Sequence, residues 1–318
     1  MTSEPFVRAD VRAYLDNLKD NPRPAFTAEF LAQIRQMPPE AMAEQDLPVG
    51  ELGEIRDVAM PGPAGTIALR LFDPRPAAER KPGPVVVFYH GGGFVVGSIA
   101  SHAGLAAEIA RGLDLPVVSV EYRLAPEHSW PAAPDDAEAA ARWIADNGAA
   151  FGRTFTGIVL CGDSAGGNLA IVTALALRDR PAALPVLMQF PIYPAVDHSH
   201  SYPSRKAFAD GYGLESFNMR LYDEHYGADP LNWRCSPILG KQEGLPRTLV
   251  VTASLDPLRD DGRAYAAATI AAGVPTTYRE MHGTIHGFAT YRRLIPSARD
   301  DLAAVLGLAK AMLVEVGR

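Results

Sequence analysis

The sequence predicts an α/β fold: a doubly wound, mostly parallel sheet of eight strands with helices on both faces. From residue 85 onward, short apolar runs rich in β-branched residues alternate with longer runs at helical spacing. Runs such as residues 85–89 are apolar at every position, which is typical of central strands covered on both faces. A chain of 318 residues is long enough to bury a core of this kind.

The elements are expected in a definite order. Two helices between residues 5 and 37, separated by a break at residues 21–24, precede the sheet, and a hairpin opens it. The strands are expected at residues 55–60, 67–72, 85–89, 117–122, 157–161, 186–190, 249–252 and 276–280. The later helices are expected at residues 102–113, 135–147, 165–177, 261–272 and 299–316.

A polar, aromatic-rich segment interrupts this alternation after the sixth strand. It contains one helical pattern, at residues 215–226, and no strand. We expect residues 1–50 and 196–236 to form a helical cap over a core built from residues 51–195 and 237–318. Aromatic residues of the insertion are expected either to line a pocket or to pack within the cap: Phe208, Tyr212, Phe217 and Tyr222.

Composition excludes several classes of protein. Hydrophobic residues make up 47% of the chain and charged residues 21%, which is typical of a globular protein rather than a disordered one. The net charge of −7 argues against a nucleic-acid partner or stable binding to an anionic membrane. The two cysteines, Cys161 and Cys235, cannot form a disulfide framework. Since the N-terminus resembles neither a secretory signal nor a membrane span, we expect a cytoplasmic protein.

One motif stands between a predicted strand and a predicted helix. Gly162-x-Ser164-x-Gly166 has the spacing of a nucleophile elbow, in which a strained turn lifts the serine Oγ off the end of a strand. Any Cβ at the flanking glycines is expected to collide with the neighbouring helix or strand. The alternative is a chance match in a chain with 28 glycines.

A serine nucleophile requires an imidazole base held by a carboxylate. In this type of fold the order along the chain is serine, acid, histidine, with the acid and the base after late strands. Asp256 follows the strand at 249–252 and His286 follows the strand at 276–280, as required. Asp260 and Asp261 are rival acids, although we expect them to cap the helix that begins there.

The main rival base is His282, which follows the same strand. His286 is favoured because Gly287 frees the backbone to turn the ring inward. His282 and His286 also have a two-histidine metal spacing, but the intervening Gly283 and β-branched residues do not favour a helix, so no metal is expected. His198 and His200 are expected at the surface.

A glycine run follows the strand at residues 85–89. Residues 90–94 read HGGGF, a pattern that supplies main-chain N–H groups to an oxyanion in lipases and esterases. A competing interpretation is a dinucleotide fingerprint, Gly91-x-Gly93-x-x-x-Gly97, with Glu121 on the ribose. Its spacing is one residue too long and its helix starts too late, so no cofactor is expected.

Five motifs together resemble the hormone-sensitive-lipase-like esterases, bacterial family IV of the α/β-hydrolase fold, in the branch whose elbow reads GDSAG. In chain order they are HGGGF at 90–94, EYRLAPEH at 121–128, GDSAGG at 162–167, DPLRD at 256–260 and HGF at 286–288. The resemblance implies Ser164 as nucleophile, His286 as general base and acid, and Asp256 as its orienting carboxylate. It also implies that the N–H groups of Gly92, Gly93 and Ala165 bind the oxyanion.

By this resemblance we expect a cofactor-free serine carboxylesterase acting on short- to medium-chain acyl or aryl esters. Amides, lactones or carbamates are alternative substrates for the same triad. A non-catalytic ligand receptor on this fold is a further alternative, although receptors that resemble the family lack the histidine that is present here as His286. The resemblance also implies a possible homodimer through the edge strand near residues 276–280.

Overall fold

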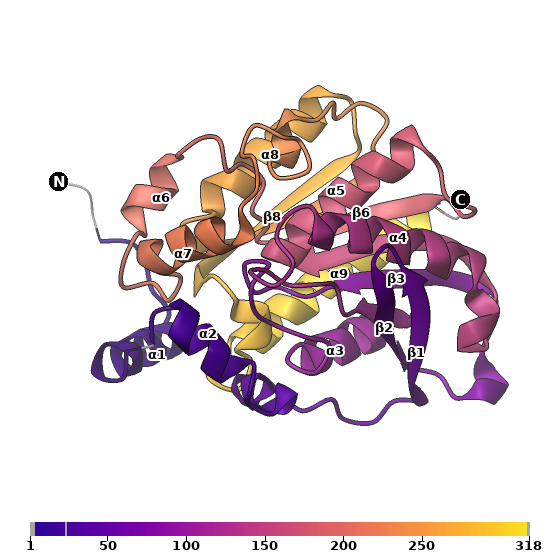
Figure 1. The fold of residues 1–318 in the computed structure, drawn as a ribbon, viewed down its shortest axis with the longest axis horizontal. Coiled ribbons are helices and arrows are strands. Elements are labelled where there is room, and N and C mark those ends of the chain that lie inside the picture. The colour runs from indigo at the N-terminus through magenta and orange to yellow at the C-terminus, as the bar shows by residue number, and fades with distance from the viewer. Residues whose placement is uncertain (1–3, 23, 317–318) are drawn as a thin grey trace.

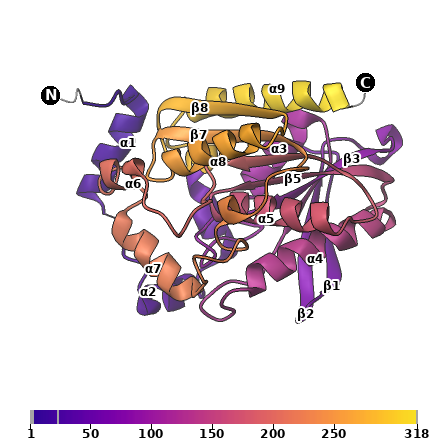
Figure 2. The same cartoon turned by 90° about the horizontal axis from the view of Figure 1, so that it is seen from above.

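The fold is a single eight-stranded sheet with helices on both sides (Figures 1 and 2). The computed structural model describes residues 4–22 and 24–316. Strand order is β1-β2-β4-β3-β5-β6-β7-β8; β2 runs antiparallel to β1 and β4, and all other pairs are parallel. The strands are β1 (Glu54–Gly62), β2 (Gly65–Asp73), β3 (Gly83–Tyr89), β4 (Val117–Val120), β5 (Phe155–Asp163), β6 (Val186–Ile192), β7 (Arg247–Leu255) and β8 (Thr276–Ile285).

Helices cover both faces because the central strands are apolar at every position. The helices are α1 (Ala9–Asp20), α2 (Ala28–Ile34), α3 (Ala103–Leu113), α4 (Ala132–Asp146), α5 (Ala165–Asp179), α6 (Pro203–Ala207), α7 (Ser216–Tyr226), α8 (Arg259–Ala271) and α9 (Ala298–Val316). Along β3, Val85 and Val87 belong to one buried cluster with α4, α5 and α8, whereas Val86 and Phe88 belong to a second cluster with α3 and α9. The predicted doubly wound, eight-stranded fold is confirmed.

Several element boundaries differ from the predicted ones. The strand expected at 117–122 ends at Val120. The helix expected from residue 135 begins at Ala132, because Pro134 lies in the first turn, where a missing N–H breaks no helical hydrogen bond. The edge strand continues from the expected residue 280 to Ile285. The insertion holds two helices rather than one, since α6 precedes α7.

Four helices gather beyond the carboxyl ends of the parallel strands. Figures 1 and 2 show α1 and α2 from the N-terminal segment beside α6 and α7 from the insertion. Phe26 joins the two segments: its N–H donates to Asn218 Oδ1 at 3.1 Å, and its ring packs on that of Tyr222 with centroids 5.0 Å apart. The division into cap and core at residues 50, 195 and 236 stays a prediction. Among the described residues, no helix is long and apolar enough to cross a membrane.

Candidate active site

The turn between β5 and α5 carries Ser164 in a strained conformation. Its φ of 54° and ψ of −117° are unusual for a residue with a side chain. The expected steric role of the glycines is confirmed: a Cβ on Gly162 would collide with the Gly166 carbonyl, and one on Gly166 with the Tyr89 carbonyl. These close approaches hold the turn sharp and leave the Ser164 hydroxyl at the carboxyl edge of the sheet.

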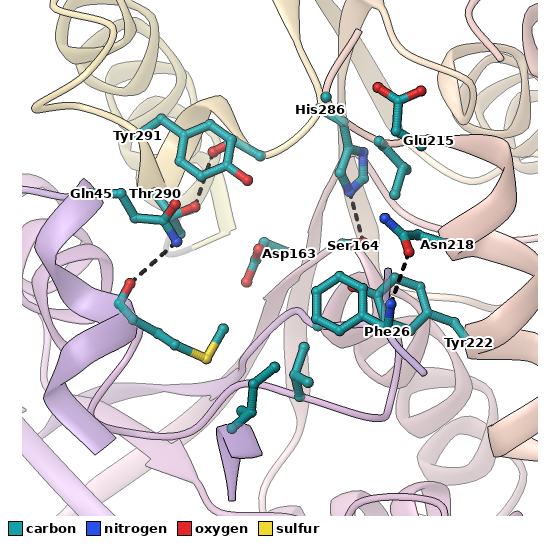
Figure 3. Close-up of a pocket in the computed structure, with 18 of the residues that line it drawn as sticks. Phe26, Gln45, Asp163, Ser164, Glu215, Asn218, Tyr222, His286, Thr290 and Tyr291 are labelled. Carbon is teal, nitrogen blue, oxygen red and sulfur yellow. Dashed lines mark hydrogen bonds between the residues drawn. The ribbon is translucent and has the colours of Figure 1, made fainter. Parts of the chain in front are cut away.

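Three side chains from the ends of different strands meet at this edge. His286, after β8, places Nε2 2.9 Å from the Oγ of Ser164 (Figure 3). Its Nδ1 lies 2.8 Å from Oδ2 of Asp256, which follows β7 and is fully buried. The other carboxylate oxygen of Asp256 accepts the N–H of Leu258 at 2.8 Å. Because the Asp256 carboxylate accepts from Nδ1, the ring proton stays on Nδ1, and Nε2 can take a proton from the serine.

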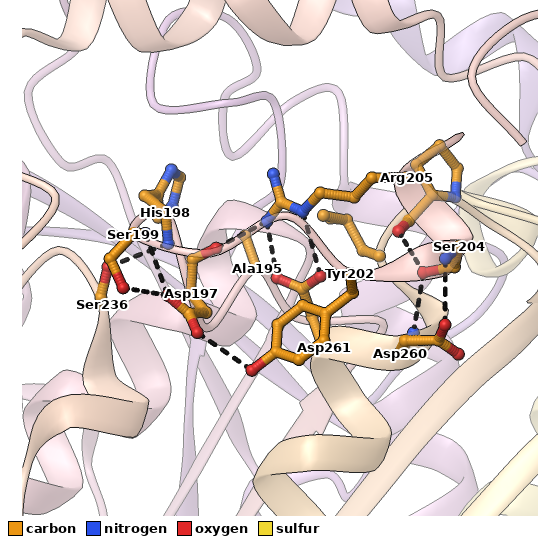
Figure 4. Close-up of polar contacts among 12 residues, drawn as sticks. Ala195, Asp197, His198, Ser199, Tyr202, Ser204, Arg205, Ser236, Asp260 and Asp261 are labelled. Atoms are coloured by element: carbon orange, nitrogen blue, oxygen red, sulfur yellow. Dashed lines mark hydrogen bonds and ion pairs between the residues drawn. The ribbon is translucent and has the colours of Figure 1, made fainter. Parts of the chain in front are cut away.

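The rival acids lie elsewhere, and the expectation that they cap a helix is wrong. Helix α8 begins at Arg259, so Asp260 and Asp261 lie inside its first turn and make no cap hydrogen bond. The helix starts early because Asp256 itself accepts the N–H of Arg259 with its carbonyl, at 3.0 Å. Asp260 and Asp261 instead bind residues of α6 (Figure 4).

Neither His282 nor His198 occupies the position of the base. His282 stacks on Phe6 with ring centroids 5.1 Å apart, which removes it as the base. His198 is not a surface residue as expected: its side chain is only 12% exposed and its Nδ1 lies 3.0 Å from Asp223. Within the described residues, no three His, Cys, Asp or Glu side chains gather in an arrangement that could hold a metal ion.

The glycine run after β3 forms a loop beside the serine. The N–H of Gly91 donates to Asp163 Oδ1 at 2.8 Å, which fixes the start of the loop. Gly92 and Gly93 have φ values of 123° and 61°, and within the described residues their amides donate to no other group. The amide of Ala165 is the first of α5 and likewise has no intrahelical acceptor. Three donors are therefore available around Ser164.

Buried polar groups brace this loop from behind. Burial by itself raises the pKa of Asp163, yet its pKa lies below the usual value because the neighbouring His102 and the Gly91 amide stabilise the carboxylate. Burial, reinforced by the neighbouring His102, lowers the pKa of His90 to about 3, so this ring is neutral. The Tyr122 hydroxyl donates to the His90 carbonyl at 2.7 Å. Sequence reasoning missed His102, which belongs to no motif used above.

A cavity of about 290 Å³ opens onto Ser164 and His286 (Figure 3). Of the four aromatic residues considered for the pocket, only Tyr222 lines it; Phe208 is buried and Phe217 is 48% exposed. Asn218 and Tyr222 lie one turn apart on α7 and face inward together, so Phe217 faces out. The N-terminal segment supplies further lining residues that sequence reasoning did not identify: Pro24, Phe26, Phe30, Ile34, Met37, Met42 and Gln45.

A second, smaller cavity of about 50 Å³ meets the first at Ser164. It is lined on one side by Gly93 and Ala165 and on the other by His198 and Met219. The space around Ser164 thus divides into one large and one small compartment.

The dinucleotide interpretation does not fit the glycine run at residues 90–94, because Glu121 accepts the N–H of Ile99 at 2.8 Å and helix α3 starts only at Ala103.

A serine nucleophile on a strained turn, at the carboxyl edge of this sheet and beside an imidazole, defines the protein as a serine hydrolase of the α/β-hydrolase type. The comparison with protein families agrees: the profile of the alpha/beta hydrolase fold family matches residues 86–290. The chain belongs to that family, and its resemblance to the hormone-sensitive-lipase-like esterases is confirmed.

Several relatives of this chain are named as esterases. The chain is 38% identical over 249 residues to Esterase LipI of Mycobacterium tuberculosis, covering 77% of this chain and 78% of LipI. It is 35% identical over 327 residues to Carboxylesterase NlhH of the same species, covering 98% and 99%. The solved ester-hydrolase EH1AB1 from the metagenome of Lake Arreo superposes with a TM-score of 0.86 at 34% identity, covering 98% of this chain and all of that one. The protein is therefore a serine carboxylic ester hydrolase.

Proposed function

We propose that the protein hydrolyses short- to medium-chain acyl or aryl esters through an acyl-enzyme on Ser164. The observation that carries the proposal is the continuous line from Ser164 Oγ through the His286 ring to Asp256, with separations of 2.9 and 2.8 Å. This arrangement satisfies the geometric requirement for a nucleophile activated by an oriented base. The elbow sequence at residues 162–166 supports placement in the GDSAG branch of the family.

In the proposed reaction, Ser164 Oγ attacks the ester carbonyl while its proton moves to His286 Nε2. Asp256 stabilises the imidazolium, and the amides of Gly92, Gly93 and Ala165 bind the oxyanion. The C–O bond to the alcohol breaks as His286 returns the proton to the leaving oxygen. Water then attacks the acyl-enzyme, with its proton taken by His286, and the acid leaves as Ser164 Oγ regains a proton.

Two considerations support the substrate range. The chain is 35% identical to Ethyl acetate hydrolase of Pseudomonas putida and 32% identical to Arylesterase of Saccharolobus solfataricus. The cavity of about 290 Å³ is at the lower end of the size range of small-molecule sites, which favours compact esters. A receptor role is disfavoured because His286 is present and in hydrogen-bond contact with the serine. Amides, lactones and carbamates remain alternatives for the substrate.

The test is hydrolysis of p-nitrophenyl esters from acetyl to palmitoyl. We expect the highest kcat/KM for the short acyl chains, and we expect Ser164→Ala to lower it by about 10⁴-fold or more. Ser201→Ala is the control, since Ser201 is an exposed serine of the insertion and lies outside both cavities. Equal rates for wild type and Ser164→Ala would contradict the proposal.

A further inference from the structure

Acidic side chains line the larger cavity. They are Asp163 and Glu215, and no Lys or Arg is among the described residues that line it (Figure 3). The His102 ring also lines the cavity, with Nε2 3.5 Å from Asp163 Oδ1. The Asp163 carboxylate is buried beside the nucleophile and is engaged by the Gly91 N–H and the His102 ring, so the charge available to a ligand is that of Glu215. Glu215 accepts the N–H of Gly211 at 3.1 Å, which holds its carboxylate at the start of α7.

Cationic side chains near the cavity wall are committed elsewhere. Arg35, one residue beyond α2, pairs with Glu127 at 3.0 Å and also donates to the carbonyl of Val95 at 2.7 Å. Arg292 forms a buried pair with Asp46 at 2.7 Å, just beyond the 3₁₀ helix that carries Met42 and Gln45. Neither guanidinium lines the cavity. The field of Glu215 is therefore not cancelled by either guanidinium.

Aromatic rings form much of the remaining wall. Phe26 packs against Phe30 and Tyr222, with ring centroids 5.7 and 5.0 Å apart, and Tyr291 lies across the cavity from them (Figure 3). Ring faces carry negative electrostatic potential and attract cations, most strongly where water is excluded. A quaternary ammonium group is weakly hydrated and suits such a wall, whereas a carboxylate or sulfonate would be repelled by both the rings and Glu215.

The two compartments suggest which half of an ester lies in which. The smaller cavity is lined by Gly93 and Ala165, whose amides bind the oxyanion in the proposed reaction, and its 50 Å³ suits a short acyl group. The larger cavity, at about 290 Å³, is then left for the alcohol. A two-carbon spacer between ester oxygen and nitrogen leaves the cation in this larger compartment.

We propose that the larger cavity is a binding site for a cationic alcohol group, so that the preferred substrates are short-chain esters of quaternary or tertiary amino alcohols. This inference rests on the proposed function and names the substrate class of the same site. It also implies discrimination against esters whose alcohol part carries a negative charge.

The test compares three acetate esters of similar shape: acetylcholine, its neutral carbon analogue 3,3-dimethylbutyl acetate, and the anionic 2-acetoxyethanesulfonate. We expect kcat/KM to be about tenfold higher for the cationic ester than for the neutral one, and about tenfold lower for the anionic ester. A neutral ester that is hydrolysed as fast as the cationic one, or an anionic ester as fast as the neutral one, would overturn the inference.

Variants assign the preference to this cavity. Glu215→Gln removes one charge and Phe30→Leu removes one ring, and each should lower the ratio of cationic to neutral kcat/KM by about threefold or more. Glu224→Gln is the matched control, because Glu224 is an exposed carboxylate of α7, the helix that Glu215 precedes, and does not line the cavity. Its ratio should equal that of the wild type. Unchanged ratios in both Glu215→Gln and Phe30→Leu would overturn the inference.

A binding experiment separates failure of this inference from failure of the proposed function. If the neutral acetate is not hydrolysed, the proposed function fails, but Ser164→Ala still presents the same cavity for calorimetry. We expect phenyltrimethylammonium to bind this variant at least about tenfold more tightly than benzenesulfonate. Equal affinities, or tighter binding of the sulfonate, would overturn the inference regardless of activity.

Discussion

The Asp256 carboxylate decides which imidazole nitrogen faces the nucleophile. One of its oxygens accepts the N–H of Leu258 and the other faces His286 Nδ1, so both are engaged by donors. Nε2 is therefore left without a proton, facing Ser164. A buried carboxylate in this position orients the ring and stabilises the imidazolium that forms during the reaction.

Asp256→Asn should inactivate the enzyme without unfolding it. In this variant the side-chain amide oxygen still accepts the Leu258 N–H, so the NH₂ group faces His286. Because the NH₂ group is a donor, Nδ1 must accept, and the ring proton moves to Nε2, which can then no longer take the proton of Ser164. We expect kcat to fall by about 10⁴-fold with a nearly unchanged Tm. Asp260→Asn is the control and should retain activity, since Asp260 binds α6 and not His286. Near-normal turnover in Asp256→Asn would refute its assigned role.

The catalytic residues could be predicted because their chemistry dictates residue type, order and spacing. Gly162, Ser164 and Gly166 follow from the sterics of the turn, and Asp256 and His286 from the requirement for an acid and a base after late strands. The cavity wall could not be predicted. Phe26 reaches it through contacts with α7, nearly 200 residues away in the chain, which no local pattern reports.

At the scale of elements, a buried ion pair joins the insertion to helix α8, which begins three residues after Asp256. Arg205 of α6 donates to Asp261 of α8 at 2.7 Å, and this carboxylate is fully buried (Figure 4). Burial raises the pKa of Asp261 to about 6, although the nearby Arg205 opposes the change. Next to it, Asp260 accepts the N–H of Ser204 at 3.0 Å. The position of α6 is thus coupled to residues one turn beyond Asp256.

The raised pKa of Asp261 gives the stability a definite pH dependence. Because the folded-state pKa of about 6 exceeds the unfolded value near 3.8, Asp261 stays protonated up to a higher pH in the folded protein than in the unfolded chain. The wild type should therefore lose unfolding free energy relative to Asp261→Asn as the pH rises from about 4 to about 6. Denaturant unfolding at a series of pH values measures this difference.

Asp260→Asn provides a control, because the unfolding free energy that Asp260 contributes should change with pH in the opposite direction. Burial alone would raise the pKa of Asp260, but Arg259, Arg263 and the Ser204 amide together hold it below the usual value. Its contribution to stability should be constant above about pH 4 and lost only at lower pH. A wild type that gains stability relative to Asp261→Asn between pH 4 and 6 would show that the Arg205 pair outweighs the cost of burial.

The strands were predicted more reliably than the helices of the insertion, for a physical reason. A strand such as β3 is apolar along its whole length because both faces are covered, which leaves a clear signal. Helix α6 has only five residues, beginning with Pro203, and is held by contacts with α8 rather than by an apolar stripe of its own. Tertiary contacts of this kind leave no local periodicity.

At the scale of the whole molecule, the two sheet edges differ in direction and setting. The edge strand β8 pairs with β7 on one side only, in parallel, whereas the opposite edge is the antiparallel hairpin of β1 and β2. An unpaired strand edge presents backbone groups to a partner. Association through β8 remains our prediction for the quaternary structure.

Sedimentation velocity should detect a species of about twice the 34.1 kDa chain mass at micromolar concentration. Hydrogen exchange then locates the contact: amides of β8 should become more protected as the protein concentration rises. Strand β1 is the internal control and should show no such change, because it lies at the other edge. A monomer at every concentration, or protection confined to β1, would contradict the prediction.

The most direct measurement of the central claim is covalent labelling with an alkyl fluorophosphonate, followed by mass spectrometry of the intact protein and its peptides. The phosphonate mimics the tetrahedral intermediate and reacts only with an activated serine. The account predicts a single adduct on Ser164 in the wild type and none in Ser164→Ala. An unlabelled wild type, or an adduct on another residue, would contradict it.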